Sequence, residues 1–331
     1  MFRTHHPSPR GSCGASAVLL SAHEEHWRRI SRRRPPIDDA TPIDPARPSR
    51  LRAYYELTKP GITFYVMITA GVSAYVASRG AIELLSAIHA MLGTGLSTAG
   101  ALALNQFVER DFDARMTRTR GRPLPSGRLT PRQALVCGAV LLAVGLVYLA
   151  AVSGWLSAGV AAASAVAYLG VYTPLKRHSY VATLAGAVPG ALPTLIGWTA
   201  VTGSLDQGAL VLFSIAYLWQ LPHVLGLAWM LREDYAKVGF KLIPDGGGRV
   251  IGRHMVAATA LLVPASASPT LLGLTGYWYM GGAVLASVGF LGVAVSAAGD
   301  MTDARARALF LASLVYHPVL LGFMLFDTVR L

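Results

Sequence analysis

Residues 101–113 read Ala101-Leu-Ala-Leu-Asn105-Gln-Phe-Val-Glu109-Arg-Asp111-Phe-Asp113. At about 100° per residue, the side chains of Asn105, Glu109 and Asp113 drift by only roughly 40° from one to the next. They form one polar stripe on an otherwise apolar helix, and Asp111 falls off that stripe. Acidic side chains at membrane depth are costly, so the stripe predicts either a functional site or a paired structural one.

The apolar run that leads into this stripe is one of nine along the chain. A bilayer-spanning helix needs about 20 residues with few charges. Runs of that kind lie near 61–79, 84–107, 133–152, 155–173, 180–201, 209–231, 255–274, 277–298 and 307–328. Of the 331 residues, 53% are hydrophobic and only 14% are charged, whereas about a quarter are charged in ordinary soluble domains. The sequence therefore predicts an all-α polytopic membrane protein with nine transmembrane helices.

Basic residues are distributed unevenly over the segments between these spans. With nine spans, 27 of the 29 Lys and Arg fall on one side of the membrane, and only Arg79 and Arg330 fall on the other. Because basic loops stay cytoplasmic, we expect a cytoplasmic N-terminus. The same distribution accounts for the net charge of +12 without a nucleic-acid partner. The two cysteines, Cys13 and Cys137, are too few and too far apart for a disulfide framework or a metal site.

The first 50 residues differ in kind from the rest. They include three consecutive arginines from Arg32 and show no sustained hydrophobic periodicity. We expect a disordered basic tail that contacts anionic membrane lipid, followed by a nine-helix membrane domain over 51–331. A cleaved transit peptide is the alternative, but such peptides are poor in acids and this tail contains Glu24 and Asp38. The same acids favour a prokaryotic cytoplasmic membrane, with the mitochondrial inner membrane as the alternative.

The polar stripe has the residue types of a magnesium site. Mg²⁺ takes oxygen ligands, usually one or two carboxylates, and completes its shell with water and substrate phosphate. Glu109 and Asp113 would supply carboxylates, and Asn105 would supply an amide oxygen or an amide donor. Arg122, in the basic loop that follows, is a candidate for bidentate contact with a diphosphate. The alternative is that the two carboxylates only neutralise neighbouring arginines.

Two further segments on the same side of the membrane carry anion-binding or metal-binding residue types. One reads Tyr172-Thr-Pro-Leu-Lys176, and a lysine ammonium is a compact charge suited to phosphate. The other ends the sixth span with Arg232-Glu-Asp234. The segments after spans 2, 4 and 6 all face one compartment, so we expect Tyr172 and Lys176 to reach the same mouth as the stripe.

In their order and spacing, these motifs resemble those of the UbiA-type intramembrane prenyltransferases. The first motif of that superfamily is similar to Asn105…Glu109…Asp113 with Arg118-Thr119 and Arg122-Pro-Leu-Pro125. Other details resemble the branch that attaches a farnesyl group to heme B, namely Leu57-Thr-Lys59-Pro60, Tyr172-Thr-Pro-Leu-Lys176-Arg177, Gly186…Gly190, Trp219-Gln-Leu-Pro222-His223 and Arg232-Glu-Asp234-Tyr235. The similarity covers about 51–328. Two departures stand out: Glu109 occupies a position that is often Asp, and the second aspartate-rich motif of the wider superfamily is absent, as in the heme branch.

The resemblance implies a reaction in which heme B, farnesyl diphosphate and water give heme O and pyrophosphate, with Mg²⁺ as cofactor. It implies that Asn105, Glu109 and Asp113 hold the metal and, with Lys176, form the catalytic set. It implies substrate binding by Lys59, Arg118, Arg122, Tyr172, Arg177, His223, Arg232 and Asp234. The family also suggests a heme-copper oxidase pathway, so heme A synthase and oxidase-assembly proteins are the expected partners.

For two of these residues the role stays open. His223 lies inside a span, directly after Pro222, and either faces heme, relays a proton or bonds a carbonyl that the proline frees. Asp234 or its neighbour Glu233 either binds a second Mg²⁺ or orients Lys176 and Arg232.

Three other functions compete with the farnesylation of heme B. A related prenyltransferase that acts on a quinone-precursor ring or a chlorophyllide would use the same diphosphate site with a different acceptor pocket. A transporter would carry paired repeats and ions near the midplane, whereas the charges here cluster at one interface. A CDP-alcohol phosphotransferase would carry a glycine-containing acidic signature, which the sequence does not contain.

Overall fold

The computed structural model describes residues 49–81 and 84–330, so nearly all of the predicted disordered tail lies outside the described residues. Within that part the chain is helical, with one isolated bridge between Thr275 and Thr328. The helices are α2 (Arg50–Leu57), α3 (Pro60–Ala77), α4 (Leu84–Asp113), α5 (Pro131–Val152), α6 (Trp155–Val166), the π-helix η1 (Ala167–Tyr172), α7 (Thr173–Leu175), α8 (Val181–Thr202), α9 (Gln207–Met230), α10 (Arg232–Ala236), α11 (Gly247–Leu271), α12 (Tyr277–Gly299) and α13 (Asp303–Phe326).

Nine helical segments of the described residues are long and apolar enough to cross a membrane. Eight are single helices, and the fourth, Trp155–Leu175, runs through α6, η1 and α7. The predicted all-α architecture is therefore confirmed. Most ends differ from the predicted runs by one to four residues, but α4 continues to Asp113 and α11 already begins at Gly247.

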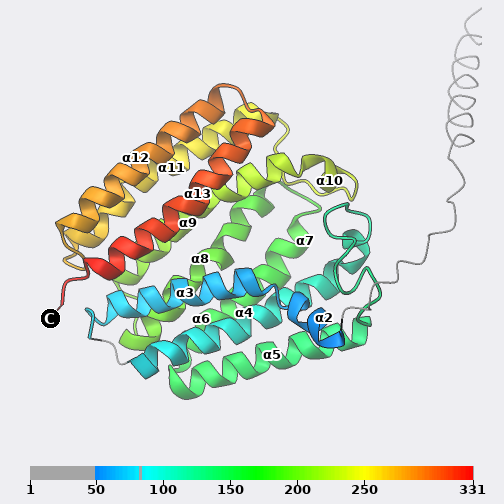
Figure 1. The fold of residues 1–331 in the computed structure, drawn as a ribbon, viewed down its shortest axis with the longest axis horizontal. Coiled ribbons are helices and arrows are strands. Elements are labelled where there is room, and N and C mark those ends of the chain that lie inside the picture. Colours follow the sequence, from blue (N-terminus) through cyan, green and yellow to red (C-terminus); the bar gives the residue numbers. More distant parts are fainter. Residues whose placement is uncertain (1–48, 82–83, 331) are drawn as a thin grey trace, which may run out of the picture. The chain divides into compact units, whose positions relative to one another are not determined.

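Neighbouring spans pack through small residues. α4 packs on α5, α3 on α8, and α11 on both α9 and α12, as the arrangement in Figure 1 shows. A Cβ on Gly197 of α8 would lie 1.9 Å from the carbonyl oxygen of Ala70 on α3. Only glycine lets the two backbones approach so closely, as is common where membrane helices cross.

The first span begins at a strained residue. Lys59, directly before Pro60 and α3, has φ 47° and ψ 65°, in the left-handed region that a residue with a Cβ seldom adopts. Non-glycine residues in this region cost of order 1–3 kcal/mol and cluster at functional sites. The strain at Lys59 therefore marks it as a candidate residue of a functional site.

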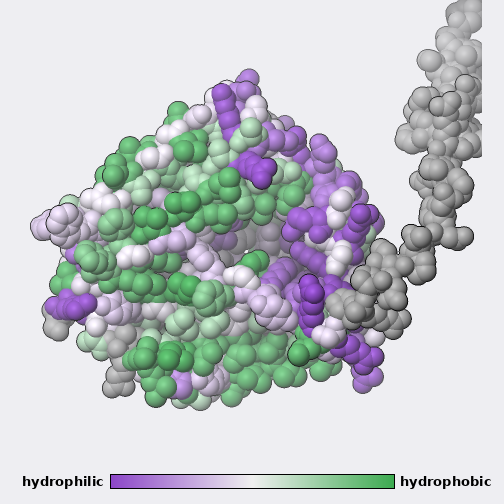
Figure 2. Space-filling view, in the orientation of Figure 1, coloured by the Kyte–Doolittle hydropathy of each residue, from purple (hydrophilic) through white to green (hydrophobic). Residues whose placement is uncertain are grey.

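Hydrophilic residues gather at one end of the bundle, which we call the polar end. It consists of α2, α10 and the segments 114–130, 176–180 and 237–246. Figure 2 shows the hydrophilic surface concentrated there, while the sides of the bundle are largely apolar. The polar stripe of α4 ends at this face, so the fold brings it close to the segments that follow spans 4 and 6.

Candidate active site

The polar stripe of α4 is buried and lines a cavity at the polar end. Asn105, Glu109 and Asp113 are 1%, 5% and 1% exposed. The cavity has a volume of about 610 Å³, and we call it the polar cavity. Its lining also includes Lys59, Arg118, Arg122, Tyr172 and Lys176. Eight of the twelve residues predicted for the site therefore meet in one cavity.

Each carboxylate of the stripe is paired with one cation. Nη1 of Arg122 donates to both oxygens of Asp113, at 2.7 and 2.6 Å. Nζ of Lys176 donates to Oε1 of Glu109 at 2.8 Å, and both side chains are at least 92% buried. Burial opposes the charge on Lys176, but Tyr172 and the Glu109 carboxylate outweigh it and hold the pKa of Lys176 above its ordinary value. Each buried carboxylate of the stripe therefore has one basic side chain within hydrogen-bond distance.

Asn105 is fixed by two hydrogen bonds to the fourth span. Its Nδ2 donates to Oγ1 of Thr173 at 3.1 Å, and its Oδ1 accepts from the hydroxyl of Tyr168 at 3.2 Å. Oγ1 of Thr173 in turn donates to the carbonyl of Tyr168 at 2.8 Å. Tyr168 lies in the π-helix η1, and short π-helical turns occur frequently at functional sites. Tyr168 could not be identified from the sequence, because no residue pattern indicates where a π-helix forms.

Lys59 is a half-buried cation at the inner edge of the polar cavity. It forms no ion pair within the described residues. Removal from solvent, together with the nearby charges of Arg122 and Lys176, lowers the pKa of Lys59 to about 7. A half-buried amine without an ion-pair partner is suited to receive an anion.

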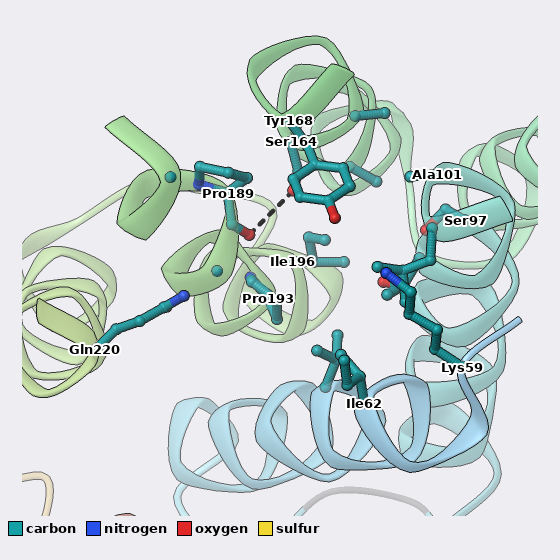
Figure 3. A pocket seen from close by; sticks show the side chains of 17 residues that line it. Lys59, Ile62, Ser97, Ala101, Ser164, Tyr168, Pro189, Pro193, Ile196 and Gln220 are labelled. Carbon is teal, nitrogen blue, oxygen red and sulfur yellow. Dashed lines mark hydrogen bonds between the residues drawn. The ribbon is translucent and has the colours of Figure 1, made fainter. Parts of the chain in front are cut away.

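A second cavity continues from the first into the bundle. Its volume is about 200 Å³, and its lining from α3, α4, α6 and α8 is largely apolar or small, so we call it the apolar cavity. Figure 3 shows Lys59, Ile62 and Tyr168 around it, and all three line the polar cavity as well. The two cavities therefore adjoin. The only carboxamide of the lining, Gln220, reaches in from α9.

The loop between α4 and α5 covers the polar cavity. Asp234 of α10 accepts hydrogen bonds from the backbone amides of Thr117 and Arg118 at 3.2 and 3.0 Å, and from Nζ of Lys237 at 2.6 Å. Lys237 and the Arg118 amide hold the pKa of Asp234 below its ordinary value. Asp234 therefore positions the loop. It forms no hydrogen bond with Lys176 or Arg232 among the described residues, so the structure does not show it orienting these two side chains.

Three other predicted residues lie outside the lining of both cavities. Arg177 is exposed, with its guanidinium 5.3 Å from the ring centre of Phe112. Arg232 pairs with Asp303 at 2.5 Å. Nδ1 of His223 bonds Oγ of Ser313 at 2.8 Å. The sequence identified these three by residue type and by location on a span or loop, but the direction of each side chain depends on its neighbours.

A buried aromatic cluster surrounds His223, and it includes His317, to which no sequence pattern assigned a role. His317 is 2% exposed, its ring lies 4.1 Å from that of Trp219, and its Nδ1 bonds the hydroxyl of Tyr65. Trp219 also stacks on His223, with ring centres 5.4 Å apart. This cluster joins α3, α9 and α13, and gives these helices a polar contact in an apolar region.

The polar cavity holds the oxygen ligands of a divalent-metal site and the basic side chains of a diphosphate site. Comparisons with known proteins indicate the same class of protein. The sequence profile of the UbiA prenyltransferase family matches residues 66–316, and the chain belongs to that family. It is an enzyme that transfers prenyl groups. The protoheme IX farnesyltransferase of Solibacter usitatus is 41% identical over 288 residues, which cover 84% of this chain and 99% of the relative. That of Koribacter versatilis is 37% identical over 295 residues, 86% and 95% of the two chains. The predicted family is thus confirmed.

Solved structures with low sequence identity share the fold. A digeranylgeranylglyceryl phosphate synthase superposes with a TM-score of 0.72 at 18% identity, over 85% of this chain and 99% of that one. A UbiA homolog from Archaeoglobus fulgidus, bound to GPP and Mg²⁺, has a TM-score of 0.60 at 15% identity, over 82% and 99%.

Proposed function

We propose that this chain transfers the farnesyl group of farnesyl diphosphate to a vinyl group of heme B, with addition of water, giving heme O and pyrophosphate. The observation that carries the proposal is the pair of adjoining cavities. One is lined with cations and an acid–amide stripe, and the other is apolar. The curated relatives named protoheme IX farnesyltransferase, which this chain matches over most of their length, support the choice of donor and acceptor.

We assign the diphosphate to the polar cavity. Asn105, Glu109 and Asp113 have the oxygen ligands that Mg²⁺ prefers and lie on one face of one helix. When bound, Mg²⁺ would neutralise charge on the diphosphate and so improve it as a leaving group. The chain's own cations act in the same sense where negative charge develops on the leaving oxygen.

Four basic residues provide this charge. Lys59 and Arg118 line the cavity and form no ion pair within the described residues. Arg122 uses only Nη1 on Asp113, which leaves its other guanidinium nitrogens for phosphate oxygens. Lys176 is held on Glu109, and a diphosphate entering the cavity would share its ammonium. Tyr172 fixes that ammonium, which lies 4.2 Å from its ring centre.

The apolar cavity takes the hydrocarbon chain. Its walls come from α3, α4, α6 and α8 and present mostly methyl groups, prolines and glycines. The serines of the lining are satisfied internally, as Ser164 donates to the carbonyl of Pro189 at 3.2 Å (Figure 3). Such a wall holds few ordered waters, and this protects an allylic cation from premature hydrolysis.

Heme B then has to present its vinyl group at the mouth of the apolar cavity. Leu227, Tyr235, Phe240 and Leu242 form an apolar side of the polar cavity on which a porphyrin can lie. We keep His223 and Arg232 as proposed acceptor contacts, although neither lines the cavities. Arg177 is kept as a surface cation that draws anionic substrate to the mouth.

We also propose that the polar end lies on the cytoplasmic side of a bacterial cytoplasmic membrane, because basic loops stay cytoplasmic. The product would pass to heme A synthase or to heme-copper oxidase assembly. The basic residues 1–50 would contact anionic lipid.

The test uses purified protein in detergent with farnesyl diphosphate, Mg²⁺ and either heme B or a quinone-precursor ring acid as acceptor. Mass spectrometry of both acceptors decides between them. A hydroxyethylfarnesyl heme, with no prenylated ring acid, is the expected result. Prenylation of the ring acid alone would keep the diphosphate site and refute the heme assignment.

A further inference from the structure

The junction of the two cavities is where the bond of the donor must break. In a prenyl diphosphate, the C1–O bond joins the charged group to the hydrocarbon chain. If the diphosphate fills the polar cavity and the chain fills the apolar one, as proposed above, this bond lies where the cavities meet. Lys59, Ile62 and Tyr168 are the residues that line both. One of them is a cation, one is aliphatic and one carries an aromatic ring.

The ring of Tyr168 is held firmly at this junction. Its hydroxyl donates to Oδ1 of Asn105 at 3.2 Å. Its ring stacks on that of Tyr172, with centres 5.5 Å apart and planes inclined by 27°. Figure 3 shows the ring reaching into the apolar cavity, with its hydroxyl directed to the side from which Lys59 enters.

The neighbouring ring of Tyr172 is not equally available to a second cation. Nζ of Lys176 lies 4.2 Å from the centre of that ring, so the electron-rich face already holds a positive charge. No cation lies over the ring of Tyr168 among the described residues. Of the two stacked tyrosines, Tyr168 is therefore the one with a face free for a cation.

We propose that Tyr168 is a catalytic residue whose ring face stabilises the allylic cation formed from the prenyl diphosphate. The C1–O bond breaks and its electron pair leaves with the diphosphate oxygen, beside the ammonium of Lys59. Positive charge then spreads over C1 to C3 of the chain and lies against the ring of Tyr168 until the vinyl carbon of the acceptor bonds C1. The ring of Tyr168 thus faces the developing positive charge, and the ammonium of Lys59 faces the developing negative charge.

The test replaces Tyr168 by phenylalanine, 4-fluorophenylalanine and 3,4,5-trifluorophenylalanine. These side chains have nearly the same shape but progressively weaker negative potential on the ring face. Tyr168→Phe loses the hydroxyl that bonds Asn105 but keeps the ring, so it is the reference of the series. Relative to it, the single-turnover rate of pyrophosphate release should fall with each fluorine, to roughly 30-fold in total, which corresponds to about 2 kcal/mol of cation–π stabilisation. Tyr168→Leu should match the trifluorinated variant.

Two controls separate chemistry from structure. Binding of the unreactive farnesyl thiolodiphosphate should change less than threefold through the series, since the analogue carries no cation. The same fluorinated residues at Tyr217, which packs on Phe213 and lines neither cavity, should leave the rate unchanged.

The result for Tyr168 can be told apart from the result for the proposed function, on which its placement rests. Pyrophosphate release is measured with heme B and without an acceptor, and the porphyrin is analysed separately. A flat fluorine series alongside farnesylated heme would overturn the role of Tyr168 and leave the function standing. A graded series without any farnesylated heme would support Tyr168 and overturn the acceptor.

Discussion

Replacing Arg122 by glutamine should leave the buried carboxylate of Asp113 without its ion-pair partner. The melting temperature of the protein should then depend more strongly on Mg²⁺. Asp113 is 1% exposed and Arg122 donates to both of its oxygens. Removing one partner of a buried ion pair costs about 3–5 kcal/mol. Because the Arg122 side chain is 20% exposed, we expect the low end, about 3 kcal/mol. At about 2 °C per kcal/mol for a chain of this size, the melting temperature should fall by about 6 °C.

Mg²⁺ should recover part of that loss, because it can replace the missing positive charge beside Asp113. The assay is thermal unfolding in detergent, followed by tryptophan fluorescence, in EDTA and across a Mg²⁺ titration. Arg120→Gln is the matched control, since Arg120 belongs to the same loop and is exposed. Equal losses in the two variants would refute the stabilisation assigned to the ion pair of Arg122 and Asp113. A Mg²⁺ response of Arg122→Gln no larger than that of the parent would refute the assignment of Asp113 as a metal ligand.

Three further outcomes follow from the same geometry. The pKa of Lys59 is lowered to about 7 from an ordinary 10.5, so the unfolded chain binds more protons than the folded one between these two values. The free energy of unfolding of the substrate-free protein should therefore rise with pH in that window. Thermal melting across this pH range should show the rise in the parent and not in Lys59→Met. Asp234→Asn should weaken the hydrogen bonds to the backbone amides of Thr117 and Arg118. Limited proteolysis should then cut the loop between α4 and α5 several times faster in this variant than in the parent. Lys176→Met should lower the melting temperature more than the double variant with Glu109→Gln, because the single change leaves a buried carboxylate unpaired.

Hydrophobic run length was sufficient to predict the all-α fold, because membrane spans are set by a length that the sequence shows directly. The apolar run of the second span ended at 107, but the stripe of Asn105, Glu109 and Asp113 already required the helix to reach Asp113, as α4 does. The partners of the two carboxylates lie on other segments and cannot be read from the local sequence. The start of α11 at Gly247 was missed because its first turns are not apolar.

The stripe of α4 at the centre of the site could be predicted from the sequence, whereas the residues around it could not. Residues at helical spacing on α4 had to share a face, and the segments after spans 2, 4 and 6 had to meet at one end. Tyr168 could not be found in this way, because its position depends on a π-helical turn of the backbone. Asp234 was recognised as an important acid, but its contacts with loop amides come from tertiary packing. His317 belongs to a cluster formed by three helices far apart in the sequence.

Asp113→Ala and Asp111→Ala should differ sharply in the formation of farnesylated heme from heme B, farnesyl diphosphate and Mg²⁺. Asp113 lies on the buried stripe, whereas Asp111 is two residues away, exposed, and 3.8 Å from Arg110. We expect hydroxyethylfarnesyl heme from the parent and from Asp111→Ala, and on the order of a hundredfold less from Asp113→Ala. Equal product from the two variants would refute the assignment of Asp113 to the metal and diphosphate site.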